Sequence, residues 1–329
     1  MDRFIHRRTF RDIVRGFSNT SLDGQPIYVK HFTSHDQVEF DSRYRAILKS
    51  ALDKGVPSEK ESLEFQKSEG FWTDEDDRFI KDQKNYITAL RDNKKALILK
   101  SAIDAHNENI KSTEKALEKK VLERNSIIGN TAEKYARTKA NDFYIIKSFF
   151  IDEQLSVPRF SEKAANELSY SDLAKSISCY NAAASNFEER KIQNLILDEF
   201  FYVYFPFSEN TVDFFGNPIV QLTDYQLTLI VYTRLFKSIF EKYDKIPEKI
   251  RKDPEALLDF GSVSDESREK ARSQLTHDSA GASTLVGATK EDLEYLGVEV
   301  GERGDSLHDA AVKSGGSLSM EDLMKLHGA

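Results

Sequence analysis

Cysteine is nearly absent from this chain of 329 residues, since Cys179 is the only one. No disulfide can therefore form within the chain, which fits a reducing compartment. Long apolar runs are also missing: the two most apolar segments, 192–207 and 227–240, each carry two charged side chains and are too short to span a bilayer. The N-terminal residues hold no apolar stretch typical of a signal peptide. We therefore expect a soluble protein of the cytoplasm.

Aromatic residues are scarce after Phe260. Of the 36 aromatic residues, 35 lie at or before that position and only Tyr295 follows it, whereas nine of the 15 glycines lie after it. This break in composition predicts a folded body up to Phe260 and a flexible interaction tail over residues 261–329. Capped segments between the glycines of the tail predict short helices, which are marginal in water on their own.

Charge of one sign does not dominate, because the formal net charge is only −8. That value argues against binding of nucleic acid over the whole surface. The charges are nevertheless uneven: residues 262–329 hold 13 acids against seven Lys and Arg, and the first 15 residues hold five arginines against two acids. These arginines are candidates for contacts with phosphate or with an acidic partner: Arg3, Arg7, Arg8, Arg11 and Arg15.

Proline is absent between Thr73 and Phe150, and Gly129 is the only glycine there. Apolar residues recur at sevenfold spacing in parts of this stretch, which is typical of a coiled-coil seam, but polar residues interrupt the seam. We therefore expect a long helical hairpin that bends near residues 97–101 rather than one continuous rod. Gly129 is expected to end its second arm.

Capping and turn signals predict the other elements. Residues 1–20 predict an amphipathic helix and residues 25–32 a strand. Ser34 with Gln37 predicts a capping box, and further caps are expected at Ser58, Thr131 and Thr223. A helix over residues 187–205 is expected to end at Pro206. Eight aromatic residues between 200 and 215 have no Lys or Arg among them, which favours packing in the core or in a subunit interface over base stacking.

The predicted fold class is therefore mainly α, with a helical body, a long helical hairpin, a small N-terminal β element and a flexible C-terminal tail with short helices. The expected regions follow one another along the chain: an N-terminal arm with a small β/α region (1–72), the long helical hairpin (73–150), a helical globular region (151–260) and the tail (261–329).

Catalytic and metal-binding constellations are absent. Gly281–Lys290 resembles a phosphate-binding loop but lacks its Gly-Lys-Ser/Thr ending, so a linker is favoured. His31 and His35 lack a third ligand, so a surface pair is favoured. Asp74–Asp77 suit the first turn of a helix, and Cys179 lacks a histidine partner and is expected to be a buried thiol. We expect no enzyme, cofactor or metal; an enzyme assembled from scattered residues is the remaining alternative.

The pattern Glu-Asp-Leu-x-x-Leu occurs twice in the tail, as Glu291–Leu296 and Glu321–Leu326. On a helix the two leucines share one face, where they can enter a groove, and the acids suit the helix N-terminus. Capped amphipathic turns also converge on such strings without any docking role. If the segments dock, two tethered copies gain from a repetitive or ring-shaped partner. The candidate partner-binding residues are Asp292, Leu293, Leu296, Asp322, Leu323 and Leu326.

Four strings carry a resemblance to a known group: Ile27–Phe32, Gly70–Asp76, Ile128–Ala136 and Phe214–Thr223. Together they resemble uncharacterised proteins of large tailed bacteriophages with contractile tails, over residues 4–260 only. The resemblance implies a non-enzymatic structural or assembly component of the tail, baseplate or neck, located in the virion or the host cytoplasm. It would bind other phage structural or assembly proteins, with a homo-oligomer possible. The alternative is a cytoplasmic tail-assembly chaperone or coiled-coil adaptor that binds a client transiently.

Overall fold

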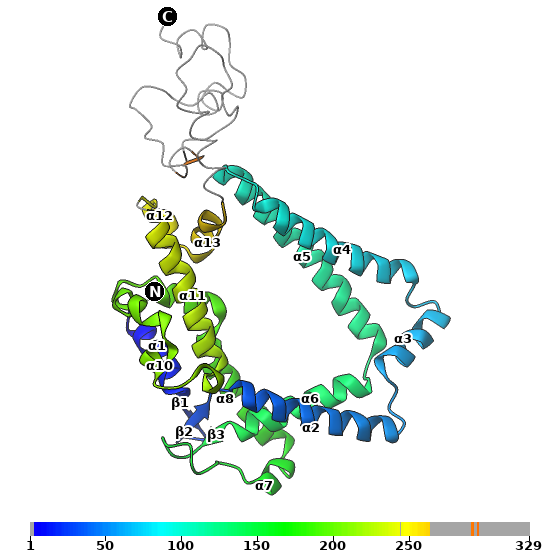
Figure 1. Ribbon diagram of the computed structural model, residues 1–329. Coiled ribbons are helices and arrows are strands. Elements are labelled where there is room, and N and C mark those ends of the chain that lie inside the picture. Colours follow the sequence, from blue (N-terminus) through cyan, green and yellow to red (C-terminus); the bar gives the residue numbers. More distant parts are fainter. Residues whose placement is uncertain (1–2, 244, 264–290, 293–294, 296–329) are drawn as a thin grey trace, which may run out of the picture. The chain divides into compact units, whose positions relative to one another are not determined.

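The computed structural model describes residues 3–243, 245–263, 291–292 and 295, and these are mainly helical, with one small antiparallel sheet (Figure 1). This confirms the predicted fold class. The chain forms two compact units: the first comprises Met1–Thr73 and Arg124–Ser238, and the second comprises Asp74–Glu123 and Ile239–Ala329. Each unit is therefore built from two stretches that are distant in sequence, whereas the sequence suggested consecutive regions. Within the described residues, every helix is too short or too polar to cross a membrane.

The first unit contains most of the secondary structure. Its helices are α1 (Arg3–Arg15), α2 (Ser34–Asp53), α3 (Glu59–Ser68), α6 (Ala132–Lys147), α7 (Glu162–Asn166), α8 (Tyr170–Ala184), α9 (Glu189–Ile196) and α10 (Thr211–Phe215). Its strands are β1 (Phe17–Leu22), β2 (Gln25–Lys30) and β3 (Phe149–Phe150), and its 3-10 segments are η1 (Ser185–Phe187), η2 (Glu199–Glu209) and η3 (Ile219–Gln221). The second unit holds α4 (Asp74–Lys94), α12 (Glu248–Arg251) and α13 (Pro254–Ser262). The unit boundaries fall within α5 (Lys100–Ile128) and α11 (Asp224–Lys242).

The sheet begins directly after helix α1. Strand β2 confirms the predicted strand, but β1 lies within residues 1–20, so the prediction of one helix there is wrong beyond Arg15. Gly16 has φ +75°, a left-handed conformation that ends α1 and turns the chain into β1. Asp23 and Gly24, with φ of 52° and 76°, form the tight turn between β1 and β2. The strand order is β1-β2-β3, and both pairs are antiparallel.

Helix α2 starts from a capping box one residue earlier than predicted. The Thr33 hydroxyl accepts from the Asp36 backbone N–H at 3.4 Å, and Asp36 accepts from the Thr33 N–H at 2.9 Å. Ser34 and Gln37 do not form the box, because Lys30 Nζ donates to the Asp36 carboxylate at 2.7 Å and fixes that carboxylate as the reciprocal acceptor. The other three predicted caps are confirmed: Ser58, Thr131 and Thr223.

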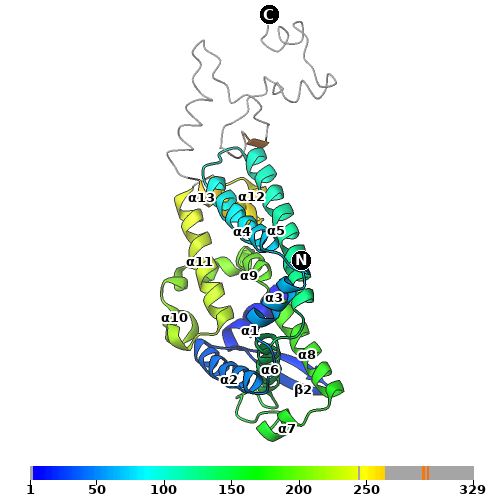
Figure 2. The ribbon, with the colours of Figure 1, turned by 90° about the vertical axis from the view of Figure 1, so that its right-hand side faces the viewer.

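Small and aromatic side chains build the interior of the first unit. Helix α2 lies beside α6 in both views (Figures 1 and 2), and Ala132, Ala136 and Ala140 are fully buried at fourfold spacing on one face of α6. Phe201 is fully buried, and its ring lies 5.3 Å from that of Phe10. The aromatic residues between 200 and 215 therefore contribute to the core, which is one of the two roles predicted for them.

The helix expected over residues 187–205 is instead broken in two. Helix α9 ends at Ile196, and η2 continues through Pro206, so the prediction that Pro206 ends the helix is wrong. Asp198 lies at the break with an extended backbone (φ −75°, ψ 136°). Its carboxylate contacts His6 Nδ1 on α1 at 2.8 Å. This tertiary contact competes with helix continuation, which a local pattern does not reveal.

The second unit is organised around the predicted helical hairpin. Helices α4 and α5 run antiparallel, with Ile87, Leu90 and Ile110 buried between them. Lys120 pairs with Asp76 at 2.7 Å, so one acid of the first turn of α4 meets the far end of the hairpin. The connection between the helices covers residues 95–99, at the predicted bend.

Candidate functional site

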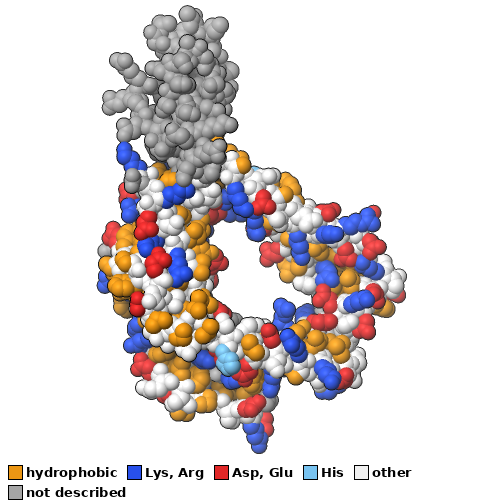
Figure 3. All heavy atoms as spheres, in the orientation of Figure 1, with side chains coloured by type: hydrophobic (Ala, Val, Ile, Leu, Met, Phe, Trp, Pro, Cys, Tyr) orange, Lys and Arg blue, Asp and Glu red, His pale blue; other side chains and the backbone are white. Residues whose placement is uncertain are grey.

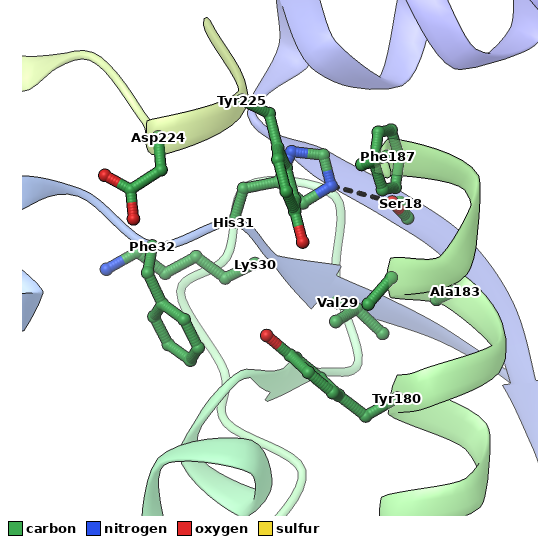
Figure 4. Close-up of a pocket in the computed structure, with 11 residues that line it drawn as sticks. Ser18, Val29, Lys30, His31, Phe32, Tyr180, Ala183, Phe187, Asp224 and Tyr225 are labelled. Atoms are coloured by element: carbon green, nitrogen blue, oxygen red, sulfur yellow. Dashed lines mark hydrogen bonds between the residues drawn. The ribbon is translucent and has the colours of Figure 1, made fainter. Parts of the chain in front are cut away.

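A cavity of about 120 Å³ lies in the first unit at the end of β2 (Figure 4). The residues of β2 that line it continue into His31 and Phe32, and α8, η1 and the start of α11 supply the other walls. Figure 4 shows the hydroxyls of Tyr180 and Tyr225 directed into the same space in front of Val29. The volume equals that of roughly four water molecules in the liquid.

His31 is the most buried titratable side chain at this cavity. It is 4% exposed, and its Nε2 lies 2.7 Å from Ser18 Oγ. Its ring meets the rings of Phe187 and Tyr225 edge-on, at 4.7 and 5.0 Å between centroids. Burial lowers the pKa of His31 to about 3, so the imidazole is neutral at pH 7. Its Nδ1 has no hydrogen-bond partner among the described residues.

The Ser18–His31 pair contains a hydroxyl and an imidazole, as a nucleophile and its base do, but it lacks the orienting group and the pKa that such a pair needs. In an activated pair a third group orients the base, and the described residues place none on Nδ1. An imidazole whose pKa is about 3 is also a weak base at neutral pH. Ser18 lies opposite Val29 in the β1–β2 ladder. The pair therefore links β1 to the residue that follows β2, and it lacks the features of an activated nucleophile.

The sequence suggested that His31 and His35 form a surface pair, and this is wrong for His31. His35 is exposed on α2, whereas His31 is buried beyond the end of β2. The signal lay in the strand periodicity, because His31 follows Ile27 and Val29 at twofold spacing and both are buried. Within the part of the chain that is described, no group of three His, Cys, Asp or Glu side chains is arranged to hold a metal ion.

Two tyrosines and an acid complete the cavity. Burial raises the pKa of Tyr225, as does the negative charge of Asp224. Burial also raises the pKa of Asp224, and the negative charge of Asp36 adds to this effect. Cys179 lies on α8 with its Sγ 3.4 Å from the carbonyl oxygen of Ser21 on β1. The side chain is partly exposed, so the expectation of a buried thiol is wrong.

The N-terminal arginines lie on α1, which starts at Arg3. Arg7 lies over the ring of Phe200 at 5.5 Å. Arg8 donates to the carbonyl oxygen of Asn19 at 3.2 Å. Two others pair with acids: Arg11 with Asp12 and Arg15 with Glu153, both at 2.8 Å. Basic and acidic side chains are interspersed on the face shown in Figure 3. The predicted basic arm is therefore partly neutralised within the chain.

Part of the first Glu-Asp-Leu segment is anchored on the second unit. Asp292 is fully buried, and its carboxylate accepts from the Ser101 N–H at 2.7 Å and from the Ser101 hydroxyl at 2.8 Å. Ser101 is the second residue of α5, so Asp292 satisfies the donors that an N-cap side chain usually satisfies. Tyr295 is 3% exposed, and its ring meets Phe260 edge-on at 5.2 Å.

The structure thus assigns Asp292 an intramolecular contact, whereas the sequence suggested a contact with a partner. Tyr295 also anchors the segment, but it occupies an unspecified position of the pattern and was not among the predicted residues. It is the lone aromatic residue after Phe260. Five predicted partner-binding residues lie outside the described residues: Leu293, Leu296, Asp322, Leu323 and Leu326. The predicted linker 281–290 also lies outside them.

Comparisons with known proteins do not place this chain in a family: no protein-family model, no curated protein and no solved structure matches it.

Proposed function

We propose that this protein is a non-enzymatic structural or assembly component of a tailed-phage particle. In this role it binds other virion proteins through its helical body and its C-terminal segment. The phage setting rests on the resemblance of the four strings within residues 4–260. The binding role rests mainly on one observation, the contacts of Asp292 with Ser101 and of Tyr295 with Phe260 within the second unit.

That anchoring supports a docking role for the Glu-Asp-Leu pattern. One carboxylate satisfies the donors at the start of α5, and one aromatic side chain packs on Phe260. Glu291 adds an exposed ion pair with Lys249 at 3.8 Å. A helix N-terminus and an adjacent apolar surface are features that helical proteins offer in many places. Because the pattern recurs at Glu321–Leu326, the chain carries a second segment with the same acids and leucines.

Exposed apolar side chains on the first unit also support protein binding. The segment from η2 to η3 exposes several large apolar residues although it packs aromatic rings inward. Those more than half exposed are Val203, Phe207, Ile219 and Val220. Exposed apolar side chains that gather in one region are typical of surfaces that contact other proteins. A neighbouring virion protein would cover them in an assembled particle.

The proposal is tested by quantitative mass spectrometry of purified phage particles and of tail-assembly intermediates from infected cells. We expect the protein in both samples, at a fixed ratio to other structural proteins. Its presence in intermediates alone would replace a structural role with that of a transient chaperone or adaptor. Its absence from both samples would contradict the proposal.

A further inference from the structure

A groove of about 700 Å³ runs between α2 and α6 in the first unit. Its walls carry three basic side chains, and no Asp or Glu lines it. Aliphatic side chains and hydroxyl groups line the rest, and Tyr135, which is 49% exposed, also borders it. The basic residues are Arg43, Lys54 and Lys134, and the aliphatic residues are Ala46, Ile47, Ala51 and Val56. The groove therefore combines positive charge with an apolar surface.

Two acids lie close to the groove: one is bonded to another helix, and the other is an exposed partner of Arg43. Glu133 lies in the first turn of α6, but its carboxylate accepts from the Glu59 backbone N–H at 2.8 Å, at the start of α3. Glu162 pairs with Arg43 at 3.6 Å but is itself 72% exposed. The positive end of the α6 dipole adds to the charge at the same place, where Asn130 and Thr131 line the groove. An acidic group that enters the groove thus meets a favourable potential.

The chain itself contains a segment with the matching chemistry. Glu321 and Asp322 supply two adjacent acids, and Leu323 and Leu326 supply an apolar face if the segment is helical. The first copy shows how such a segment is held: acids meet a lysine and a helix N-terminus, and an apolar side chain meets an apolar surface. The groove between α2 and α6 offers the same three features.

The second copy does not suit the place that the first copy occupies. Lys325 stands where the first copy has Tyr295, which is buried against Phe260. Burial of a charged lysine in place of this tyrosine carries a desolvation cost, although Asp253 lines the same pocket. The wider groove between α2 and α6 leaves room for Lys325 to remain in water. The two copies differ at both unspecified positions of the pattern, and the replacement of Tyr295 by Lys325 favours separate binding sites for them.

We propose that the groove between α2 and α6 binds the Ser319–His327 segment of a second copy of this chain. This inference rests on the proposed function, because it requires that copies of the chain meet in the assembly. The acids of the segment meet Arg43, Lys54 and Lys134, and its leucines cover Ile47 and Val56.

The first experiment measures binding of a fluorescein-labelled peptide of residues 317–329 by fluorescence anisotropy. The receptor is the full chain with Glu321→Lys and Asp322→Lys, so that its own segment does not compete. Combining Lys54→Glu with Lys134→Glu should raise Kd about tenfold or more. The matched control combines Lys49→Glu with Lys139→Glu, which places the same charge change on exposed positions of the same helices, outside the groove. We expect the control to change Kd by less than about threefold.

Two further peptides separate specific docking from simple charge attraction. A peptide with Glu321→Lys and Asp322→Lys should bind the groove variant better than it binds the unmodified groove. A peptide with Leu323→Ser and Leu326→Ser should lose binding. Equal weakening by the groove and control variants, or retained binding of the serine peptide, would overturn the proposal in favour of a general attraction for polyanions. Circular dichroism verifies that each variant keeps its helix content.

Sedimentation velocity of the natural chain tests whether a second copy supplies the segment. We expect self-association that increases with concentration, is lost in the groove variant and is retained in the control. A monomer at every concentration would overturn the proposal. If docking fails while the protein is present in particles, only this inference fails; absence from particles and intermediates removes the proposed function whatever the peptide does.

Discussion

The two units bury polar groups in different ways. In the first unit the buried pair Ser18 and His31 is neutral, and aromatic rings surround it. The first unit also buries carboxylates, since Asp12 is 5% exposed and Asp198 contacts His6. In the second unit, carboxylates supply the contacts between distant segments: Asp259 pairs with Lys94 and accepts from Asn107 Nδ2 at 3.0 Å, and Asp292 caps α5. A neutral pair avoids the desolvation penalty of ions, whereas buried ions are stable only while their partners remain.

The largest effect should come from the aromatic interior of the first unit. Phe201→Ala removes a fully buried ring and should reduce the free energy of unfolding by about 3–5 kcal/mol, because a cavity replaces its contacts. Trp72, the only tryptophan, is buried in the first unit, so urea unfolding followed by its fluorescence reports on that unit. Phe207→Ala, at a ring that is 52% exposed, is the control. Equal losses in both variants would contradict this description of the core.

The next largest effect should be a dependence of the first unit's stability on pH, caused by protonation of His31. The folded first unit keeps His31 neutral down to about pH 3, whereas the unfolded chain binds a proton below about pH 6.5. Its stability should therefore fall as the pH decreases from 6.5 towards 3, by roughly 2–3 kcal/mol at pH 4.5. His31→Gln should flatten this dependence, and His35→Gln should leave it unchanged, as measured by Trp72 fluorescence in urea. An unchanged slope in His31→Gln would rule out His31 as its source.

A second loss of stability in the first unit is expected at a lower pH than the loss caused by His31, and it comes from protonation of Asp36. Burial works against the ionised form of Asp36, but hydrogen bonds from Lys30 and Thr33 and the positive charge of Lys30 together lower its pKa below the usual value. The resulting stabilisation is present above the ordinary pKa of aspartate and is lost as the pH falls through the lowered value. His31→Gln should therefore retain a residual loss of stability at the most acidic pH.

Removal of a buried carboxylate should destabilise the second unit alone. Asp259→Ala leaves Lys94 and Asn107 without their acceptor, which should cost about 2–3 kcal/mol. Trp72 fluorescence follows the first unit only, whereas far-ultraviolet circular dichroism follows the helices of both units. The urea midpoint of the second unit, measured by circular dichroism, should therefore fall. The control Glu248→Ala removes an exposed ion pair with Lys252 and should cause no measurable change. A matching shift in the Trp72 transition would show that the two units do not respond separately.

Local signals in the sequence predicted much of the fold. Ser58, Thr131 and Thr223 cap helices as expected, because the bonds of a cap lie within a few residues. The hairpin of α4 and α5 followed from the absence of proline and from the apolar spacing. The break at Asp198 was not predictable from such patterns, since it depends on His6, which is 192 residues away.

The candidate sites were harder to predict for the same reason. The cavity at His31 gathers side chains from β2, α8 and α11, and their approach is a property of the fold rather than of local spacing. The acid-leucine pattern in the tail was visible in the sequence. The sequence did not show, however, that Asp292 in its first copy accepts a hydrogen bond from Ser101, 191 residues earlier. Only the strand periodicity around His31 and the lone aromatic Tyr295 were local signals that pointed to burial.

The smallest change in stability should accompany the loss of the Asp292 anchor. Asp292→Ala removes the acceptor of the Ser101 N–H and hydroxyl and should reduce stability by about 1 kcal/mol, as for the loss of an N-cap. Glu291→Ala, at a side chain that is 66% exposed, is the control and should have little effect. Urea unfolding followed by circular dichroism compares the two variants.

Hydrogen exchange at the start of α5 tests most directly whether the tail segment is anchored there. In the natural chain, the Ser101 amide should exchange slowly because Asp292 accepts its hydrogen bond. Asp292→Ala should accelerate that exchange about fivefold, and Glu291→Ala should leave it unchanged. If the Ser101 amide exchanges equally fast in the natural chain and in Asp292→Ala, the segment is not anchored through Asp292, and the docking role of the Glu-Asp-Leu pattern loses its support.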